Sequence, residues 1–509
     1  MRLLTFVALM ALGVCASAAQ MQQITVQTLR DKIQGGWAGQ MIGVSFGAPT
    51  EFRYRAQINE DPLPPWKPEL VANALNQDDL YVDMTLAKVL DDKGLNATTD
   101  DFGAMFREAK YRLWHANLAA RRALKRGVPP SKSGRPEHNV HANDIDFQIE
   151  ADFIGLMAPG LYRSTNEIAW RAGRVMNYGD GIYGGMFIAA MYAAAFFEND
   201  PRKVVETGLA VLPAKSPYAM LIRDVLNWHK QHPNDWKAVW HLIEKKWHNR
   251  EPCPGGALTP FNIDAKLNGA YVALGLLYGG RDMGRTLEVS TRAGQDSDCN
   301  PASAAGILGV MLGYRAIPDE WKSGIPAIAD KKFSYTDFTF KTICESTEKR
   351  AIVLILKTGG RRDGDTLFVR TQKPKPAKLE VWDDYGSPVE RIAVADSRWR
   401  FTGDWKDVKG TRIAGRKGAE ASLEFDGTGI ILVGPYLVSG GKADIYLDGK
   451  LVKTVDVFPD EDQNKSGESV FHAFKLKNTR HTVRLVVRGE PYPGSKGSEI
   501  GLNGAIVFR

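Results

Sequence analysis

The sequence predicts a multidomain protein in which an all-α bundle is followed by an all-β sandwich of the jelly-roll type. Two observations predict this order. Stretches up to about residue 326 carry apolar residues at helical spacing, whereas short runs of β-branched residues between turn signals dominate from about Trp399. The 509 residues suffice for two or three domains. We therefore expect a helical domain at 20–328, a β-rich connecting segment at 329–395 and a sandwich at 396–509.

The first 19 residues have the pattern of a secretory signal peptide. Arg2 supplies a short basic region, residues 3–14 are apolar, and the small residues at 16–18 fit a cleavage site. The apolar run is too short for a membrane span, which takes about 20 residues. A lipid anchor through Cys15 is the alternative, although Val14 before it is larger than such a signal prefers. We expect a periplasmic or secreted protein with no membrane span.

The composition is that of a globular protein, with 44% hydrophobic and 25% charged residues. The net charge of +7 is spread along the chain and the longest basic run is only 121–126, so we expect no nucleic-acid partner. The oligomeric state stays open. Removal of the leader leaves Cys253, Cys299 and Cys344, which allow at most one disulfide. Because no Cys-x-x-Cys pair exists, we expect no zinc site made of thiolates.

Start and stop signals define the expected helices. Residues 24–47 carry apolar residues at helical spacing and end in glycines. The next helix begins after Asn76, a candidate N-cap, and stops at Gly94. Stretches 184–198, 269–280 and 302–314 are apolar nearly all round and rich in small residues. We place these three at the centre of the bundle, where other helices wrap around them.

Strands are expected in the second half of the chain. Short β-branched and aromatic stretches at 333–343, 351–360 and 366–372 predict strands, and 373–378 reads as an extended link. Alternating patterns predict the strands of the sandwich at 421–425, 429–434, 443–447, 451–458, 481–489 and 504–508. Asp448-Gly449 is a hairpin signal. We expect Trp399, Phe401 and Trp405 to form sandwich core rather than to stack on sugars.

Acidic clusters in the helical part indicate the chemistry. They are Glu51, Asp78-Asp79 with Asp83, the stretch Asp144, Asp146, Glu150 and Asp152, and Asp296-x-Asp298. Asn300 reads as the N-cap of the helix that follows the last pair, with Pro301 at its first position. Acids there offset the helix dipole by about 0.3–1 kcal/mol. However, an Asp beside apolar helices is costly unless it is paired or binds a cation, and carboxylates suit Mg²⁺, Ca²⁺ or Mn²⁺.

These clusters resemble the motifs of the ADP-ribosylglycohydrolase family, in the family's order and over residues 29–314. The matching stretches are GVSFGAPTEF at 43–52, QDDLYVD at 77–83, NYGDGIYGG at 177–185 and GQDSDCNPASAAGILG at 294–309. The resemblance implies an all-α fold with a binuclear metal site. It also implies hydrolysis of a glycosidic bond at the anomeric carbon of ribose, assisted by the metals.

The resemblance implies roles for individual residues. The metal ligands would be Asp78, Asp79, Asp296, Asp298 and Gln77, with Mg²⁺ as the first choice and Ca²⁺ or Mn²⁺ as alternatives. The catalytic residues would be Glu51, Asp79 and Asp296, and the substrate-binding residues Asp144, Asp146 and Asp180. The chain departs from the family at Gln77, Leu80 and Cys299, where threonines are usual. Either one metal site is lost, or Gln77 and other acids replace the missing hydroxyl groups, with Asp83, Asp144 and Asp146 as the candidates.

Three functions fit these observations. The first is a secreted, metal-assisted hydrolase of an N- or O-glycosidic bond in a glycan or glycoconjugate. The leader disfavours intracellular ADP-ribosylated proteins, and the sandwich resembles carbohydrate-binding or galactose-binding-like modules. The second is hydrolysis of ADP-ribosyl groups from a secreted or host target. The third is a non-catalytic scaffold that binds a sugar. In each case the partner is a small or polymeric sugar.

Overall fold

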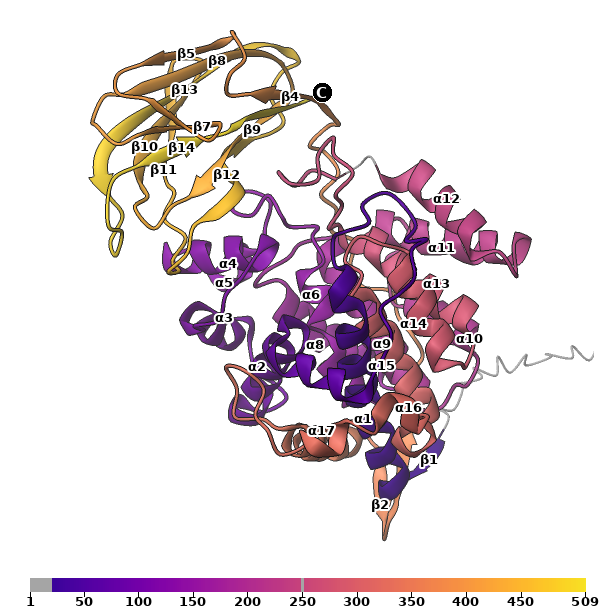
Figure 1. Cartoon of the computed structure of the whole chain (residues 1–509). Helices are drawn as coiled ribbons and strands as arrows, with labels where there is room; N and C mark the ends of the chain where they lie inside the picture. Colours follow the sequence, from indigo (N-terminus) through magenta and orange to yellow (C-terminus); the bar gives the residue numbers. More distant parts are fainter. Residues whose placement is uncertain (1–20, 249–250) are drawn as a thin grey trace, which may run out of the picture.

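The computed structural model describes residues 21–248 and 251–509. The expected leader lies outside these residues. Figure 1 shows a helical body with the sandwich at one end, beside the C-terminus, and a small sheet of β1, β2 and β3 at the other end. This order confirms the predicted fold class. Within the described residues, no helix is both long enough and apolar enough to span a bilayer.

Helices make up the first two thirds of the chain, as the periodicity predicts. Short 3₁₀ segments, η1 (Ala48–Thr50), η2 (Pro68–Asn76), η4 (Tyr314–Ala316) and η5 (Ile325–Ala327), join some of them. The α-helices are α1 (Val26–Gly47), α2 (Asp78–Lys93), α3 (Thr99–Glu108), α4 (His115–Lys125), α5 (Pro130–Ser133), α6 (Asp146–Ile149), α7 (Asp152–Leu156), α8 (Tyr162–Gly173), α9 (Asp180–Ala195), α10 (Pro201–Ala210), α11 (Pro217–Gln231), α12 (Trp236–Trp247), α13 (Ala265–Gly279), α14 (Met283–Arg292), α15 (Cys299–Leu312), α16 (Asp319–Lys322) and α17 (Phe340–Lys357).

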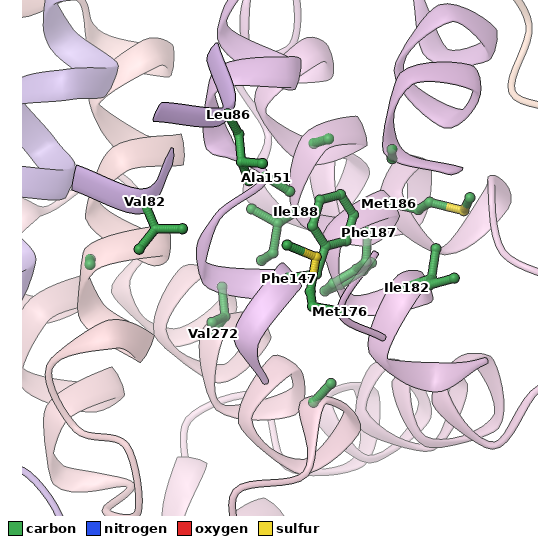
Figure 2. Close-up of a cluster of buried hydrophobic side chains, with 14 of the residues drawn as sticks. Val82, Leu86, Phe147, Ala151, Met176, Ile182, Met186, Phe187, Ile188 and Val272 are labelled. Atoms are coloured by element: carbon green, nitrogen blue, oxygen red, sulfur yellow. The ribbon is translucent and has the colours of Figure 1, made fainter. Parts of the chain in front are cut away.

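The helices α9, α13 and α15 form the buried centre, as their apolar character predicts. Every residue of α9 is buried, and nearly every residue of α13 and α15. Figure 2 shows Phe187 and Ile188 of α9 packed with Phe147 of α6 and Val82 of α2 nearby. A helix that is apolar all round is stable only when neighbours cover every face, and the outer helices do so here.

Helices α1 and α15 run antiparallel with their backbones in contact. The contact is a stripe of glycines spaced four residues apart on α1, namely Gly35, Gly39, Gly43 and Gly47. A Cβ on any of them would lie less than 3.0 Å from a backbone oxygen of the α15 side, at Gly309, Ala305, Pro301 and Ser297 in turn. Only glycine permits this approach. The end of α1 is thereby held against the start of α15.

The connecting segment differs from the prediction, because 340–357 is helix α17 rather than strands. Thr339 and Thr342 form a reciprocal capping box at its start, and Ile343, Ala351 and Ile355 are buried. The β-branched residues that suggested strands recur here at helical spacing, and burial against the bundle outweighs their weak strand propensity. The strand predicted at 366–372 is confirmed as β3 (Thr366–Arg370), which pairs with β1 (Met21–Thr25) and β2 (Arg361–Asp363).

The C-terminal part is a sandwich of antiparallel strands. One sheet has the order β11-β10-β13-β8-β5, the facing sheet the order β12-β9-β15-β4, and β14-β7-β6 form a small third sheet. The strands are β4 (Pro388–Ala393), β5 (Trp399–Thr402), β6 (Lys406–Val408), β7 (Thr411–Ala414), β8 (Glu420–Gly427), β9 (Gly429–Tyr436), β10 (Gly441–Leu447), β11 (Lys450–Asp456), β12 (Lys465–Ala473), β13 (Thr479–Pro491), β14 (Ile500–Leu502) and β15 (Gly504–Phe508).

Local signals in the sandwich act as predicted. Asp448 and Gly449 both have positive φ and join β10 to β11 as a two-residue hairpin turn. Trp399 is buried and stacks on Phe401, whose ring meets Trp405 edge to face. These aromatic side chains pack as sandwich core, as expected.

The sandwich docks on α4 through arginines. Arg126 donates to the carboxylates of Asp456 and Asp460, and Arg122 donates to the backbone oxygens of Asp456 and Phe458. The Arg122 guanidinium also lies 3.6 Å from the ring centroid of Tyr436. Figure 1 shows α4 beneath β11 and β12. The basic run at 121–126 therefore binds the chain's own second domain.

Candidate active site

The acidic clusters predicted from sequence meet at a cavity of about 480 Å³. Its floor carries Asp78, Asp296 and Glu51, with Asp79 and Asp298 buried directly beside them. We call these five residues the acidic floor. Its walls are mainly aromatic and apolar, with Phe52, Tyr81, Leu113, Trp114, His115, Ile145, Ile149, Phe261 and Ile263. A mainly apolar and aromatic lining with a few convergent polar groups is typical of a small-molecule binding site.

The glycine contact between α1 and α15 brings Glu51 to Asp296 and Asp298. Glu51 follows η1 at the end of α1, and the two aspartates stand at the start of α15. The two loops also pair by backbone hydrogen bonds, from Phe52 N to Gln295 O at 3.0 Å and from Gln295 N to Tyr54 O at 2.8 Å. Residues about 245 positions apart in sequence are thus held as neighbours by main-chain contacts.

Gln295 holds a strained backbone conformation next to the floor. Its φ is +55°, in the left-handed region that residues other than glycine rarely adopt. Its side chain accepts a hydrogen bond from Asn262 N and donates one to Pro260 O. These bonds hold the strain and set the direction in which Asp296 leaves the loop.

The helix caps differ from the prediction at both acidic motifs. Gln77, not Asn76, precedes the first turn of α2, and Asp298, not Asn300, precedes α15. Neither side chain caps its helix by a hydrogen bond. Both predictions were wrong because Asn76 instead accepts a hydrogen bond from Ser334, and Asn300 lies within the first turn of α15. Asp298 faces the other carboxylates instead, and Asn300 donates to Asn268 on α13. The structure thus uses these positions for the cavity rather than for the helix ends.

The acidic floor has two overlapping halves that share Asp298, and the ligand atoms of each are spaced to hold a divalent cation. Ligand oxygens of Glu51, Asp296 and Asp298 lie within 4.8 Å of one another, and so do ligand atoms of Asp79, Asp298 and Cys299. Asp296 Oδ1 is buried and, among the described residues, has no hydrogen-bond partner. Carboxylate oxygens are the ligands that Mg²⁺, Ca²⁺ and Mn²⁺ prefer. An unpartnered buried carboxylate oxygen is costly, which a bound cation would remedy.

Burial and mutual repulsion raise the pKa of every carboxyl in the acidic floor. The pKa of Asp78 rises to about 6 through burial and the charge of Asp298. The pKa of Glu51 rises to about 8 through burial and the charges of Asp298 and Asp78. Burial likewise holds the pKa of Asp79 and Asp296 well above the ordinary range. This cluster has more negative charge than its surroundings can stabilise, which is the condition that favours cation binding.

Cys299 is a thiol that lies against Asp79 and Asp298. Its Sγ lies 3.4 Å from Asp79 Oδ2 and 3.8 Å from Asp298 Oδ1. Burial and the surrounding carboxylates raise the pKa of this thiol well above its usual value. Cys299 therefore stays protonated and donates weak hydrogen bonds to the aspartates, as a threonine hydroxyl would in its place. A protonated thiol is a poor nucleophile.

The residues predicted to bind substrate do not all reach the cavity. Asp146 lies on its wall and accepts hydrogen bonds from Ala116 N at 3.2 Å and Asn117 N at 2.8 Å, at the start of α4. Gln77 also lines the cavity. Asp144 is buried behind this wall, bonded to His141.

Asp180 and Asp83 face other parts of the bundle. Asp180 starts α9 and accepts a hydrogen bond from Tyr218 N on α11. Asp83 is buried deeper along α2, where it accepts a hydrogen bond from Phe153 N of α7. Neither residue lines the cavity. The position of Asp83 therefore does not support the expectation that it replaces a missing threonine hydroxyl group.

The aromatic wall was not predicted from sequence. Trp114 is 45% exposed, although a tryptophan usually packs inside, and the His115 ring stacks on Phe261. The sandwich supports this wall, since Glu461 accepts a hydrogen bond from Leu113 N at 2.9 Å and Lys465 donates to Leu113 O at 2.8 Å. No motif marked these residues. The one available signal was the tryptophan directly before a helix start.

A family model described as ADP-ribosylglycohydrolase matches residues 25–345. An A type blood alpha-D-galactosamine galactosaminidase of Flavonifractor plautii is 29% identical over 104 residues, which cover 19% of this chain and 9% of that protein. The chain thus spans less than a tenth of the length of this curated relative.

Two solved structures match parts of the chain. An ADP-ribosylglycohydrolase-related protein complex is 16% identical, covers 64% of this chain and 99% of that chain, and has a TM-score of 0.40. A family 35 carbohydrate binding module from an environmental isolate is 13% identical over 23% of this chain and 90% of that chain, with a TM-score of 0.17.

Proposed function

The chain belongs to the ADP-ribosylglycohydrolase family, and from that membership we propose that it is a metal-assisted hydrolase of a glycosidic bond in a glycan or glycoconjugate. The observation that carries the proposal is the acidic floor beneath an aromatic-walled cavity. Glycosidic hydrolysis uses a pair of carboxyl groups at the reacting carbon and benefits from a surface that holds the sugar ring. The acidic floor offers the carboxyl groups, and the exposed ring of Trp114 offers the surface.

The aspartates of the acidic floor would hold the cation, with Mg²⁺ as the first choice. A bound Mg²⁺ supplies a Lewis acid that orients sugar hydroxyls and makes water a better nucleophile. We assign the general base that takes a proton from water to Asp79 or Asp296, whose carboxyl groups lie at the acidic floor. The surrounding carboxylates would also stabilise the positive charge that develops on the sugar.

Glu51 is suited to donate a proton to the leaving group. Its carboxyl lies on the solvent side of the floor, where a substrate atom can reach it. A general acid must be protonated before the reaction, and burial together with the charges of Asp298 and Asp78 raises the pKa of Glu51 to about 8 in the metal-free site. A general acid needs this protonation state together with contact to the reacting bond.

The substrate class and the location are part of the proposal. The galactosaminidase that matches part of the chain supports a sugar substrate, with galactosamine-containing glycans as the first to test. We place the protein outside the cytoplasm on the strength of the signal-peptide pattern in residues 1–19. We also propose that the sandwich binds carbohydrate next to the cavity.

A substrate screen tests the proposal. The full-length mature protein is incubated with a panel of glycans, including galactosaminides, and with peptides ADP-ribosylated on Arg or Ser, with Mg²⁺ or with EDTA. We expect Mg²⁺-dependent release of reducing sugar from a glycan. Release of free ADP-ribose alone would instead identify an ADP-ribosyl hydrolase. Binding of sugar without any turnover in Mg²⁺, Ca²⁺ or Mn²⁺ would overturn the enzymatic proposal and leave a sugar-binding scaffold.

A further inference from the structure

A second set of buried ligand groups lies behind the aromatic wall. Asp144 comes from the loop before α6, and Glu251 and Cys253 come from the loop after α12. All three side chains are buried, and one ligand atom from each lies within 4.8 Å of the other two. No sequence motif predicted that these residues lie together, because more than 100 positions separate Asp144 from the other two.

Two carboxylate oxygens in this cluster lack partners. Among the residues that the structure describes, Asp144 Oδ1 and Glu251 Oε2 make no hydrogen bond although both are buried. The neighbouring pair contrasts with them, since Asp264 is bonded to the ammonium of Lys266. An unpartnered carboxylate oxygen in the interior keeps the full cost of its desolvation. The hydrogen bonds of the described residues do not satisfy these two oxygens, whereas a bound cation would.

We propose that Asp144, Glu251 and Cys253 bind one transition-metal ion of the zinc class. A thiolate with two carboxylates is a borderline-soft ligand set that suits Zn²⁺ better than Mg²⁺. Binding converts the Cys253 thiol to a thiolate, and its proton leaves to solvent as the metal–sulfur bond forms.

His141 positions Asp144 for this role. Its Nδ1 lies 2.7 Å from Asp144 Oδ2, the oxygen opposite the unpartnered one. Its Nε2 lies 3.7 Å from the Glu468 carboxylate on β12 of the sandwich. A hydrogen-bonded partner of this kind fixes the orientation of a metal-ligating carboxylate. His141 thus joins the proposed metal site to the sandwich.

The proposed site also supports the cavity. His115 Nδ1 lies 3.6 Å from Asp144 Oδ2, and the His115 ring faces the cavity. The backbone of His115 has φ of +43°, so this ring is held in place by its surroundings rather than by local preference. An ion at Asp144 would fix the wall that His115 and Trp114 present to a substrate. It would be a structural ion, distinct from the one at the acidic floor.

Cobalt substitution tests the site on the intact protein. Full-length protein is stripped with a chelator, reloaded with Co²⁺ and examined by absorption spectroscopy, and zinc in untreated protein is measured by elemental analysis. We expect one zinc-class ion per chain and a near-ultraviolet charge-transfer band from thiolate to cobalt. Cys253→Ser should lose the band. The matched controls Cys299→Ser and Cys344→Ser, which remove the other buried free thiols, should keep it.

Other outcomes overturn the inference. A folded wild-type protein that gives no thiolate band and no bound zinc refutes it, whether or not the Cys253→Ser variant folds. A band that persists in Cys253→Ser and disappears in Cys299→Ser places the soft metal at the acidic floor instead. Because neither readout uses a substrate, failure here is distinguishable from failure of the proposed glycosidase activity. That activity is judged by Mg²⁺-dependent turnover alone.

Discussion

The acidic floor and one wall of the cavity are held in place in opposite ways. The floor rests on backbone contact between α1 and α15, where glycines leave no space for a side chain. The wall formed by Leu113, Trp114 and His115, which we call the sandwich-backed wall, rests on long charged side chains such as Glu461 from the other domain. Backbone contact fixes positions closely, while side-chain support tolerates change. The acidic floor, which we propose is catalytic, and the sandwich-backed wall, which we propose contacts the substrate, are therefore supported by separate parts of the fold.

The largest expected effect is at the floor. Asp298→Asn keeps the shape but removes a charge that both halves of the acidic floor share. We expect hydrolysis to fall about 100- to 1,000-fold, as for loss of one group that stabilises the charge of the transition state. Activity is measured on the glycan found in the substrate screen. Asp337→Asn, an exposed residue paired with Lys332, is the matched control and should retain full activity. Unchanged turnover in Asp298→Asn would refute the floor as the catalytic centre.

The second effect tests the backbone contact itself. Gly43→Ala places a methyl group against Pro301 O and must separate α1 from α15. We expect a loss of about 1–3 kcal/mol in the free energy of unfolding. Because Glu51 and Asp298 then move apart, kcat should fall by up to about 100-fold. Denaturant unfolding and steady-state kinetics measure the two effects.

Gly415→Ala is the control for this prediction. It lies in the sandwich, and a Cβ there would be at least 3.6 Å from its nearest neighbour. Its stability and kcat should match those of the wild type. Equal behaviour of the two glycine variants would contradict the view that glycine contact holds the floor.

The third effect falls on the sandwich-backed wall. Glu461→Ala removes the acceptor of Leu113 N and the partner of the buried Arg121. Since the acidic floor stays intact, we expect KM to rise about tenfold, the effect of 1.4 kcal/mol on binding, with little change in kcat. Asp426→Ala, which breaks an exposed pair with Arg480 in the same domain, should leave both constants unchanged. A fall in kcat at constant KM would instead connect this wall to the chemistry.

The smallest effect is the pH dependence of stability. The folded pKa values of Asp78 and Glu51, about 6 and about 8, lie above their values in an unfolded chain. The folded protein therefore holds more protons, and metal-free stability should fall as the pH rises from about 4 to about 8. Added Mg²⁺ should reverse the fall, because it stabilises the ionised carboxylates. Melting temperatures in EDTA and in Mg²⁺ across this range measure it. A metal-free melting temperature that rises with pH would contradict the raised pKa values.

Sequence patterns anticipated much of the fold and the carboxylates of the floor. The helical periodicity, the three small-residue stretches and the Asp448-Gly449 turn all correspond to observed elements. Helix α17 was missed because β-branched residues in an amphipathic helix resemble a strand when burial is unknown. The caps predicted at Asn76 and Asn300 do not form, because local preference yields to the needs of a buried site.

The sequence by itself determined which residue types could bind a cation, because the acids stand at the starts of apolar helices in a recognisable order. It also contained the glycines at 35, 39, 43 and 47, whose spacing of four residues marks a close helix contact. Only the tertiary structure decided that Glu51 meets Asp298, and that Asp144 turns away from the cavity toward Glu251 and Cys253. Such contacts join residues far apart in the chain, and local spacing carries no information about them.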